Sequence, residues 1–323
     1  MGSTRDEPTS AVDVLIIGGG AAGLAAALLL ARARRSVLLI DGGEPRNAPA
    51  THMHGYLGHE GIPPGDFLAI GRDEVRRYGA ELVNGTVTDV VRQADGRFRA
   101  TTGDSTTVIA RRVLLTTGLR DVLPDIPGLA DQWGRGVMHC PYCHGWEARD
   151  QALVVIGTGT GGPAQAGLFR QWSDDVTFVV HEGAGPDAGV RERLRARGVQ
   201  VIERTVVEVL TAGDEIAGVR LAGGEVVPAD VIVVDPRFEP RADAIASLGV
   251  TPVPDPTGRG LVIETDQSGA TAVPGVYAAG NAADARGQVL QAAAAGGMAA
   301  IAINADLVAD DSEAALLLTA RTR

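Results

Sequence analysis

The 323-residue chain contains no lysine, so all 29 of its basic residues are arginines. A Schiff-base lysine and the lysine of a Walker-type phosphate loop are therefore excluded. Aromatic residues make up only 4% of the chain and its net charge is −11. This composition argues against a base-stacking platform and against a basic nucleic-acid surface, so we expect neither nucleic acid nor an anionic membrane among the partners.

Long apolar runs and an apolar leader are also lacking. The apolar run in "GLAAALLLARARR", residues 23–35, is about half the length of a bilayer span and ends in arginines. The N-terminal "MGSTRDEPTS" is polar and acidic, whereas a secretory signal is basic and then apolar. With 45% hydrophobic residues and a mean hydropathy of +0.08, the sequence predicts a globular cytoplasmic protein of about two domains without a membrane span.

Cysteine occurs only twice, as Cys140 and Cys143, with a histidine on either side of the pair. In a reducing cytosol a lone Cys-x-x-Cys is more often catalytic or metal-binding than structural. The thiolate is the reactive form, and a free thiol has a pKa of about 8.5, so a base beside the sulfur is needed. His144 and His139 each adjoin a cysteine and are candidate proton acceptors, and Asp284 is a candidate to orient one of them.

Residues 13–41 predict a strand, a glycine turn, a helix and a second strand, which is a βαβ unit. Gly18, Gly20 and Gly23 form G-x-G-x-x-G at the start of the helix. These glycines allow a tight turn, close approach of the backbone to a pyrophosphate, and close packing of helix on strand. Asp41 ends the second strand, where a carboxylate can bind ribose hydroxyls. The unit indicates a dinucleotide site.

Residues 152–182 predict a second βαβ unit, with Gly157, Gly159 and Gly162 in its turn. An NADPH site needs arginines after the second strand for the 2′-phosphate, but Glu182 stands there and would repel a phosphate. Glu182 could instead hold the ribose of NADH. A βαβ scaffold that binds no nucleotide is the other interpretation, and the sequence leaves both open.

Metal or haem at the dithiol is not expected. Cys140-Pro-Tyr-Cys143-His144 matches the c-type haem attachment pattern, but it occurs in a chain predicted to be cytosolic with a dinucleotide motif. The six residues from His139 to His144 are too few to form a tetrahedral zinc cage from separate arms. We interpret "THMHGYLGH", residues 51–59, as a polar loop near the cofactor rather than a metal site.

Further markers are a strand before Thr116-Thr117-Gly118, a small-residue turn at Gly280-Asn281, and a small-residue helix starting near Gln288 and Val289. Together with the two βαβ units and the Cys-x-x-Cys, they resemble the low-molecular-weight thioredoxin reductases over nearly the whole chain. The resemblance implies an α/β fold of two Rossmann-like dinucleotide-binding domains, the second inserted in the first. Residues 1–120 and 241–323 would bind FAD, residues 121–240 would carry the dithiol, and the protein would be a homodimer.

The resemblance also implies which residues form the site. Cys143 would lie next to the flavin and Cys140 would meet the substrate. The FAD contacts would be Gly18, Gly20, Ala21, Ala22, Gly23, Asp41, Gly42, Asn47, Val87, Thr117, Gly118, Gly280, Asn281, Gln288 and Val289.

Three departures from the reductase pattern indicate a particular branch. His144 follows the second cysteine instead of an acid, His181-Glu182-Gly183 replaces His-Arg-Arg, and Gly280-Asn281 replaces Gly-Asp. With "CPYCHGWE" and "FRQWSDDV", these changes are similar to the dithiol oxidases that close disulfides in natural products of the gliotoxin and holomycin type. The resemblance implies an FAD enzyme that oxidises a small dithiol and passes the electrons to O2, giving H2O2. An NAD(P)H-dependent disulfide reductase and a flavin-binding redox sensor are the alternatives.

Overall fold

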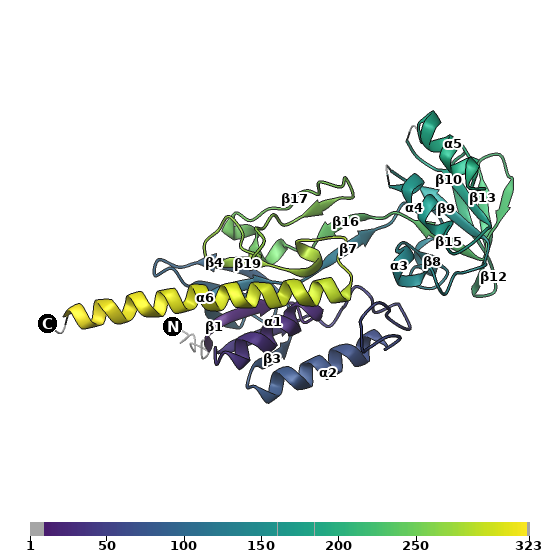
Figure 1. Cartoon of the computed structure of the whole chain (residues 1–323). Helices are drawn as coiled ribbons and strands as arrows, with labels where there is room; N and C mark the ends of the chain where they lie inside the picture. The colour runs from purple at the N-terminus through teal and green to yellow at the C-terminus, as the bar shows by residue number, and fades with distance from the viewer. Residues whose placement is uncertain (1–9, 160, 184, 322–323) are drawn as a thin grey trace, which may run out of the picture.

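The computed structural model describes residues 10–159, 161–183 and 185–321, which form two lobes joined by a narrow connection (Figure 1). The first lobe is built on a seven-stranded sheet of order β3-β2-β1-β6-β5-β4, in which β19 also pairs with β6. The strands are β1 (Ser10–Ile17), β2 (Val37–Asp41), β3 (Glu81–Asn84), β4 (Val87–Arg92), β5 (Phe98–Thr102), β6 (Thr107–Leu115) and β19 (Val276–Ala278).

The two faces of this sheet form two separate cores, as the alternation along β1 requires. Val14 and Ile16 pack with the helices on one face, and Leu15 and Ile17 pack on the opposite face. Successive side chains of a strand point to opposite faces, so the apolar second half of β1, residues 14–17, is buried on both sides. The helices of the lobe are α1 (Ala21–Arg32), α2 (Pro64–Arg77) and α6 (Val289–Arg321), with short 3-10 turns η2 (Asp243–Leu248) and η3 (Gly280–Ala282).

Small residues bring α1 and α6 into close contact. A Cβ at Gly296 would overlap the backbone oxygen of Ala22, so only glycine fits at this crossing. The close approach places the first turns of both helices beside the glycine turn that follows β1. Packing of the two helices therefore positions two helix N-termini at one end of the sheet.

The C-terminal part of α6 extends beyond the sheet (Figure 1). Arg112 of β6 donates to both carboxylate oxygens of Asp306, at 2.7 and 3.0 Å, and to Asp310 at 2.6 Å. By length and composition alone, Val289–Ala320 could cross a membrane, with a mean hydropathy of 1.5. The expectation of no membrane span rested on residues 23–35 and left this helix out. Ile303 and Leu307 lie in the core of the lobe, and buried helices of globular proteins pass the same test.

The second lobe contains a five-stranded parallel sheet of order β11-β10-β9-β15-β8 and a three-stranded antiparallel sheet β12-β13-β14. Its strands are β8 (Val137–Met138), β9 (Leu153–Gly157), β10 (Val176–Val180), β11 (Gln200–Ile202), β12 (Val206–Ala212), β13 (Glu215–Leu221), β14 (Val226–Pro228) and β15 (Val231–Val234). Its helices are η1 (Ala130–Gln132), α3 (Pro141–His144), α4 (Gly162–Phe169) and α5 (Ala188–Ala196).

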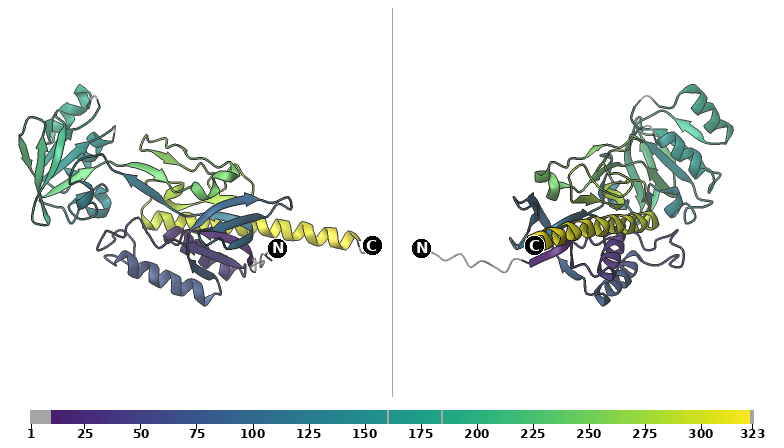
Figure 2. Two further views of the ribbon diagram at one scale, coloured as in Figure 1. Left: turned by 180° about the vertical axis from the view of Figure 1, so that it is seen from behind. Right: turned by 60° about the vertical axis from the view of Figure 1, so that its left-hand side comes forward.

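The lobes are connected by two antiparallel strands, β7 (Leu119–Val122) and β16 (Arg237–Pro240), as the left view of Figure 2 shows. Beside them lies the hairpin of β17 (Val253–Pro254) and β18 (Leu261–Val262). Both βαβ units predicted from the sequence are present, as β1-α1-β2 and β9-α4-β10. The predicted fold class, two Rossmann-like α/β units with the second between segments of the first, is confirmed.

Candidate functional site

A cavity of about 530 Å³ lies where the first lobe meets the dithiol segment of the second. The first glycine turn, the turn after β6, the residues before α6 and the Cys-x-x-Cys all line it. Among the predicted site residues, the lining includes Gly18, Gly20, Ala21, Ala22, Asp41, Gly42, Asn47, Val87, Thr117, Gly118, His139, Cys140, Cys143, His144, Gly280, Asn281, Gln288 and Val289. Residues far apart in sequence thus converge on one site.

The first glycine turn leaves room for a large anionic group. Gly18 has φ +107°, and a Cβ there would overlap the backbone of Thr116. A Cβ at Gly20 would meet nothing within 4 Å, so this part of the turn is open to the cavity. The N-terminus of α1 begins at the next residue, and a helix N-terminus favours an anion. The first glycine turn and the N-terminus of α1 together fit the pyrophosphate of FAD.

Gly23 lies outside the cavity lining but serves the packing role expected of it. A Cβ at Gly23 would overlap the backbone oxygen of Gly18, so a glycine is needed for α1 to start this close to β1. Asp41 accepts a hydrogen bond from the backbone N–H of Gly19 at 3.0 Å, and Arg72 lies 3.5 Å from its other oxygen. The Asp41 side chain is mostly buried but lines the cavity, where a ribose could reach it.

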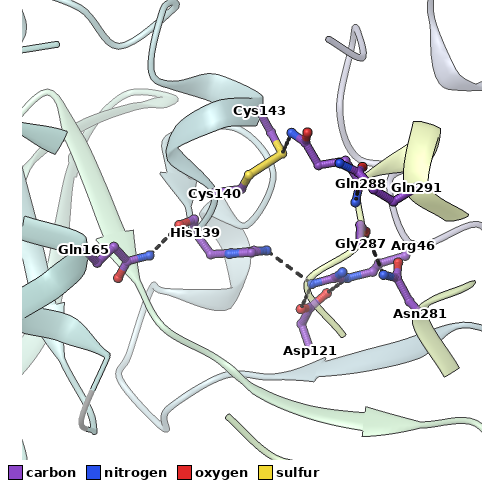
Figure 3. Close-up of a disulfide and its surroundings, with 10 residues drawn as sticks. All are labelled: Arg46, Asp121, His139, Cys140, Cys143, Gln165, Asn281, Gly287, Gln288 and Gln291. Atoms are coloured by element: carbon purple, nitrogen blue, oxygen red, sulfur yellow. Dashed lines mark hydrogen bonds and ion pairs between the residues drawn. A yellow bond between two sulfur atoms is a disulfide. The ribbon is translucent and has the colours of Figure 1, made fainter. Parts of the chain in front are cut away.

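The two cysteines form a disulfide, with their Cα atoms 5.3 Å apart. Proline follows Cys140 and opens the short helix α3, on which Cys143 lies. Gln288, just before α6, donates from Nε2 to the Sγ of Cys143 at 3.4 Å (Figure 3). Of the two sulfurs, Cys143 is therefore the one in contact with the start of α6.

His139 is fixed in a buried polar cluster (Figure 3). Arg46 donates to both oxygens of Asp121, at 2.8 and 2.6 Å, and its Nη2 lies 3.2 Å from the Nε2 of His139. A guanidinium only donates, so this Nε2 must be the unprotonated acceptor. Trp133 stacks on the imidazole with ring centroids 6.3 Å apart. The backbone oxygen of His139 accepts from Gln165.

Burial and the positive charge of Arg46 lower the pKa of His139 to about 3. A group with such a pKa does not take a proton at neutral pH. The geometry therefore argues against His139 as the base, a role that its position beside Cys140 had suggested. His139 instead links the dithiol segment to Arg46 of the first lobe.

This cluster predicts a specific pH dependence of stability. The folded pKa of His139, about 3, lies below the ordinary 6.5, so between these pH values the unfolded chain binds a proton that the folded chain does not. The free energy of unfolding should then fall as the pH drops below 6.5, by up to about 1.4 kcal/mol per pH unit from this group. In His139→Gln, the free energy of unfolding, measured with urea, should fall less steeply than in the wild type as the pH drops from about 6.5 to 5. The same dependence of the unfolding free energy on pH in both proteins would contradict the lowered pKa of His139.

His144 lies on the other side of the dithiol and is partly buried. Burial lowers its pKa, the carboxylate of Glu147 raises it, and nearby His54 lowers it. His54 itself is placed by Glu60, whose Oε1 lies 2.6 Å from its Nδ1, and Glu147 lies 3.5 Å from its Nε2. A lowered pKa keeps His144 neutral near pH 7 and able to accept a proton.

The structure does not bring Asp284 to either histidine. It lies outside the cavity lining, and its Oδ1 accepts from the backbone N–H of Arg286 at 3.0 Å. Its side chain is exposed on the turn before α6. The predicted orienting role of Asp284 has no support in this geometry. Asn281, by contrast, orders the turn by donating to the backbone oxygens of Asp284 and Gly287, at 2.9 and 2.7 Å.

A carboxylate of the protein itself lies against Gly161 of the second glycine turn, whereas a Cβ at Gly159 would meet nothing within 4 Å. A Cβ at Gly161 would overlap Oδ2 of Asp235, which lies just beyond β15. Asp235 is almost fully buried, and its Oδ1 has no hydrogen-bond partner among the described residues. Arg259, from the β17–β18 hairpin, lies 3.7 Å from Oδ2. Burial raises the pKa of Asp235 and Arg259 lowers it.

Sequence reasoning missed Arg46, Asp121 and Asp235. Arg46 and Asp121 lie within or next to the segments expected near FAD, but nothing in their spacing pairs them with His139. Asp235 directly follows strand β15 of the second lobe, at the carboxyl end of a sheet, where ligands of open α/β sheets are often bound. That position is a signal that could have singled it out.

Comparisons with known proteins agree with this geometry. The family model described as pyridine nucleotide-disulphide oxidoreductase matches residues 12–299. The crystal structure of HlmI is 44% identical and has a TM-score of 0.90, with 98% of this chain and 99% of that chain covered. An oxidoreductase from Agrobacterium tumefaciens is 35% identical with a TM-score of 0.85, covering 92% and 98%. Thioredoxin reductase sirT of Leptosphaeria maculans is 31% identical, covering 94% and 97%.

Proposed function

The chain belongs to the thioredoxin reductase-like flavoproteins of the pyridine nucleotide-disulphide oxidoreductase family, and on this premise we propose that it is an FAD-dependent dithiol oxidase. The substrate is a small-molecule dithiol, which leaves as an intramolecular disulfide, and O2 is the electron acceptor. FAD as the cofactor follows from the family, and the first glycine turn fits it. Residues 1–120 and 241–323 form the FAD domain, and residues 121–240 form the insertion with the dithiol.

The acidic second glycine turn carries the proposal. Asp235 stands against Gly161 at the start of α4, where the pyrophosphate of a nicotinamide nucleotide would approach, and Glu182 stands where a 2′-phosphate would need arginine. The carboxylate of Glu182 would repel that phosphate, and the Asp235 side chain, with Arg259 3.7 Å from it, takes up space beside Gly161, so NADPH is a poor source of electrons here. Electrons then enter from the dithiol.

The exchange chemistry balances with the two cysteines alone. A substrate thiolate attacks Sγ of Cys140, the bond between Cys140 and Cys143 breaks, and Cys143 leaves as a thiolate. The second substrate thiolate attacks the substrate sulfur of this mixed disulfide, and Cys140 leaves as a thiolate. The substrate has lost two electrons and two protons, and the enzyme disulfide has gained the electrons.

Side chains around the dithiol support these steps. His144 accepts a proton from a substrate thiol, since it is neutral near pH 7 and adjoins Cys143. Gln288 donates to the sulfur of Cys143, and the N-terminus of α6 begins one residue later, so the leaving thiolate is stabilised. When bound, FAD supplies the two-electron acceptor through which the Cys140–Cys143 disulfide is restored and O2 is reduced to H2O2.

Oxygen consumption tests the proposal directly. The purified protein with bound FAD, given dithiothreitol in air and no nicotinamide, should form one H2O2 per cyclic disulfide. An oxygen electrode and a peroxide assay measure both products. A protein that oxidises no small dithiol, yet reduces a disulfide protein with NADPH, would refute the oxidase function.

A disulfide reductase is the second candidate, because relatives such as that of Leptosphaeria maculans bear the name thioredoxin reductase. Such an enzyme would run the same two cysteines in the opposite direction, with a nicotinamide as donor. A flavin-binding redox sensor ranks third. A homodimer and a cytoplasmic location remain predictions from the resemblance and the composition.

A further inference from the structure

A histidine of the first lobe faces the turn that carries the candidate base. His54 lies in the loop before α2, and its Nε2 is 3.5 Å from Oε1 of Glu147, which follows α3 in the second lobe. Both His54 and His144 line the cofactor cavity. The side chain of His54 is 22% exposed, whereas that of Glu147 is 45% exposed. The contact therefore bridges the two lobes at the cavity wall, beside the dithiol.

Glu60 holds His54 from the other side. Its Oε1 lies 2.6 Å from Nδ1 of His54, and its Oε2 accepts from the backbone N–H of Gly55 at 2.8 Å. These two hydrogen bonds lower the pKa of Glu60, so its carboxylate is ionised near pH 7. A carboxylate only accepts, so Nδ1 of His54 carries a proton and Nε2 faces Glu147. The imidazole donates at both nitrogens only when it is positively charged.

Glu147 lies in the same turn as His144. The backbone N–H of Ala148 donates to the backbone oxygen of His144 at 3.1 Å, so the chain keeps a helical turn after α3. Residues three apart in such a turn share one side of it, which places Glu147 beside His144. After burial, the charges of Glu147 and His54 act on the pKa of His144, in opposite directions. His139 also faces His144, but its pKa of about 3 keeps it neutral near pH 7.

We propose that His54 is a positioning residue of dithiol oxidation: it pairs with Glu147 across the lobes and thereby controls the base His144. The inference rests on the proposed dithiol oxidase function and adds a control of its base. The proton of the substrate thiol passes to the imidazole of His144, and the electron pair stays on the substrate sulfur, which attacks Cys140. When Glu147 is paired with His54, its negative charge acts less on His144, so the base is more often neutral and ready to accept a proton.

Two conservative variants should shift the pH profile of oxidation in opposite directions. His54→Gln removes positive charge and releases Glu147, so the acid-side midpoint of kcat/KM for dithiothreitol should rise. Glu147→Gln removes negative charge, so this midpoint should fall. Each shift should be about 0.2–0.7 pH unit, the range expected for a partly exposed charge pair. The free enzyme, which kcat/KM reports, holds the Cys140–Cys143 disulfide, so neither cysteine contributes to the profile.

Further variants serve as controls. Glu60→Gln keeps an acceptor for Nδ1 of His54 but removes its charge, so it should shift the midpoint in the same direction as His54→Gln and by less. The double variant His54→Gln, Glu147→Gln should return towards the wild-type midpoint, because the two shifts oppose each other. His59→Gln should leave the midpoint unchanged, because His59 packs against Tyr56 and Phe67 and does not line the cavity.

Histidine NMR measures the same control without turnover. In the FAD-loaded protein labelled with 15N-histidine, the signal of His144 is assigned by its loss in His144→Gln. This imidazole should titrate at higher pH in His54→Gln and at lower pH in Glu147→Gln than in the wild type. Shifts in the same direction, no shift in either variant, or an equal shift in His59→Gln would overturn the inference.

The two measurements together separate the inference from the proposed function. NMR shifts as expected, with an unmoved kcat/KM midpoint in an active enzyme, would show that His144 is not the base and would also overturn the inference. If the wild type oxidises no dithiol, the proposed function fails, and the NMR titration alone decides whether His54 and Glu147 control the charge of His144.

Discussion

Replacement of either Cys140 or Cys143 by serine is expected to abolish dithiol oxidation, a loss of about a thousandfold or more, while FAD stays bound. Thiol exchange needs both sulfurs, because one is attacked and the other leaves. The fold needs neither, since both lie at the cavity wall outside the hydrophobic cores. Oxygen uptake and the flavin absorbance of each purified variant measure the two effects. Residual turnover above about a tenth of wild type would contradict the exchange mechanism.

The same variants assign the roles of the two sulfurs. Dibenzyl disulfide should form a benzylthio adduct on Cys140 of Cys143→Ser, releasing benzyl mercaptan, because a thiolate displaces one sulfur of the probe. The adduct should form more slowly on Cys143 of Cys140→Ser, whose sulfur contacts Gln288. Mass spectrometry of the intact protein follows both rates. Faster labelling of Cys143 than of Cys140 would reverse the assignment.

The second large effect concerns NADPH, which should not bleach the flavin rapidly under anaerobic conditions. A hydrogen bond to a charged group contributes roughly 1.5–3 kcal/mol. The chain has Glu182 and Gly183 in place of two arginines, and each 1.4 kcal/mol is a factor of about ten. Affinity for NADPH should therefore be about a hundredfold or more below that of a site with both arginines. Stopped-flow absorbance in the absence of oxygen measures the bleaching.

Variants of Glu182 and Asp235 measure how much each of these two acidic residues weakens NADPH binding. Glu182→Arg should strengthen NADPH binding, and Glu182→Arg combined with Asp235→Asn should strengthen it further, because Asp235 stands against Gly161. Dithiol oxidation should be unchanged, since neither residue lines the cofactor cavity. Fast bleaching of the wild type by NADPH, followed by reduction of a disulfide protein, would favour the reductase. Bleaching of the flavin by NADH but not by NADPH would indicate that Glu182 binds the ribose of NADH.

Local patterns in the sequence predicted the two βαβ units and the first glycine turn, and the family resemblance implied the fold class and most residues of the cofactor cavity. A glycine with positive φ at Gly18, the alternation along β1 and the small residues of α6 are requirements of backbone and helix packing at those positions. The start of α6 at Val289 was predicted for the same reason. Each of these features leaves a local pattern of residue types in the sequence, so the sequence by itself was enough to predict it.

The chemistry of the side chains was decided by the tertiary structure. His139 and His144 both adjoin a cysteine, yet burial and then the charge of Arg46, 93 residues before His139, lower the pKa of His139 to about 3. Asp235 reaches Gly161 only because β15 lies beside β9 in the second sheet. His54 of the first lobe lies 3.5 Å from Glu147 of the second, near His144. The pKa of a side chain depends on its burial and on nearby charges, and these come from residues that make contact only when the chain folds. Spacing within one segment of the sequence therefore does not predict it.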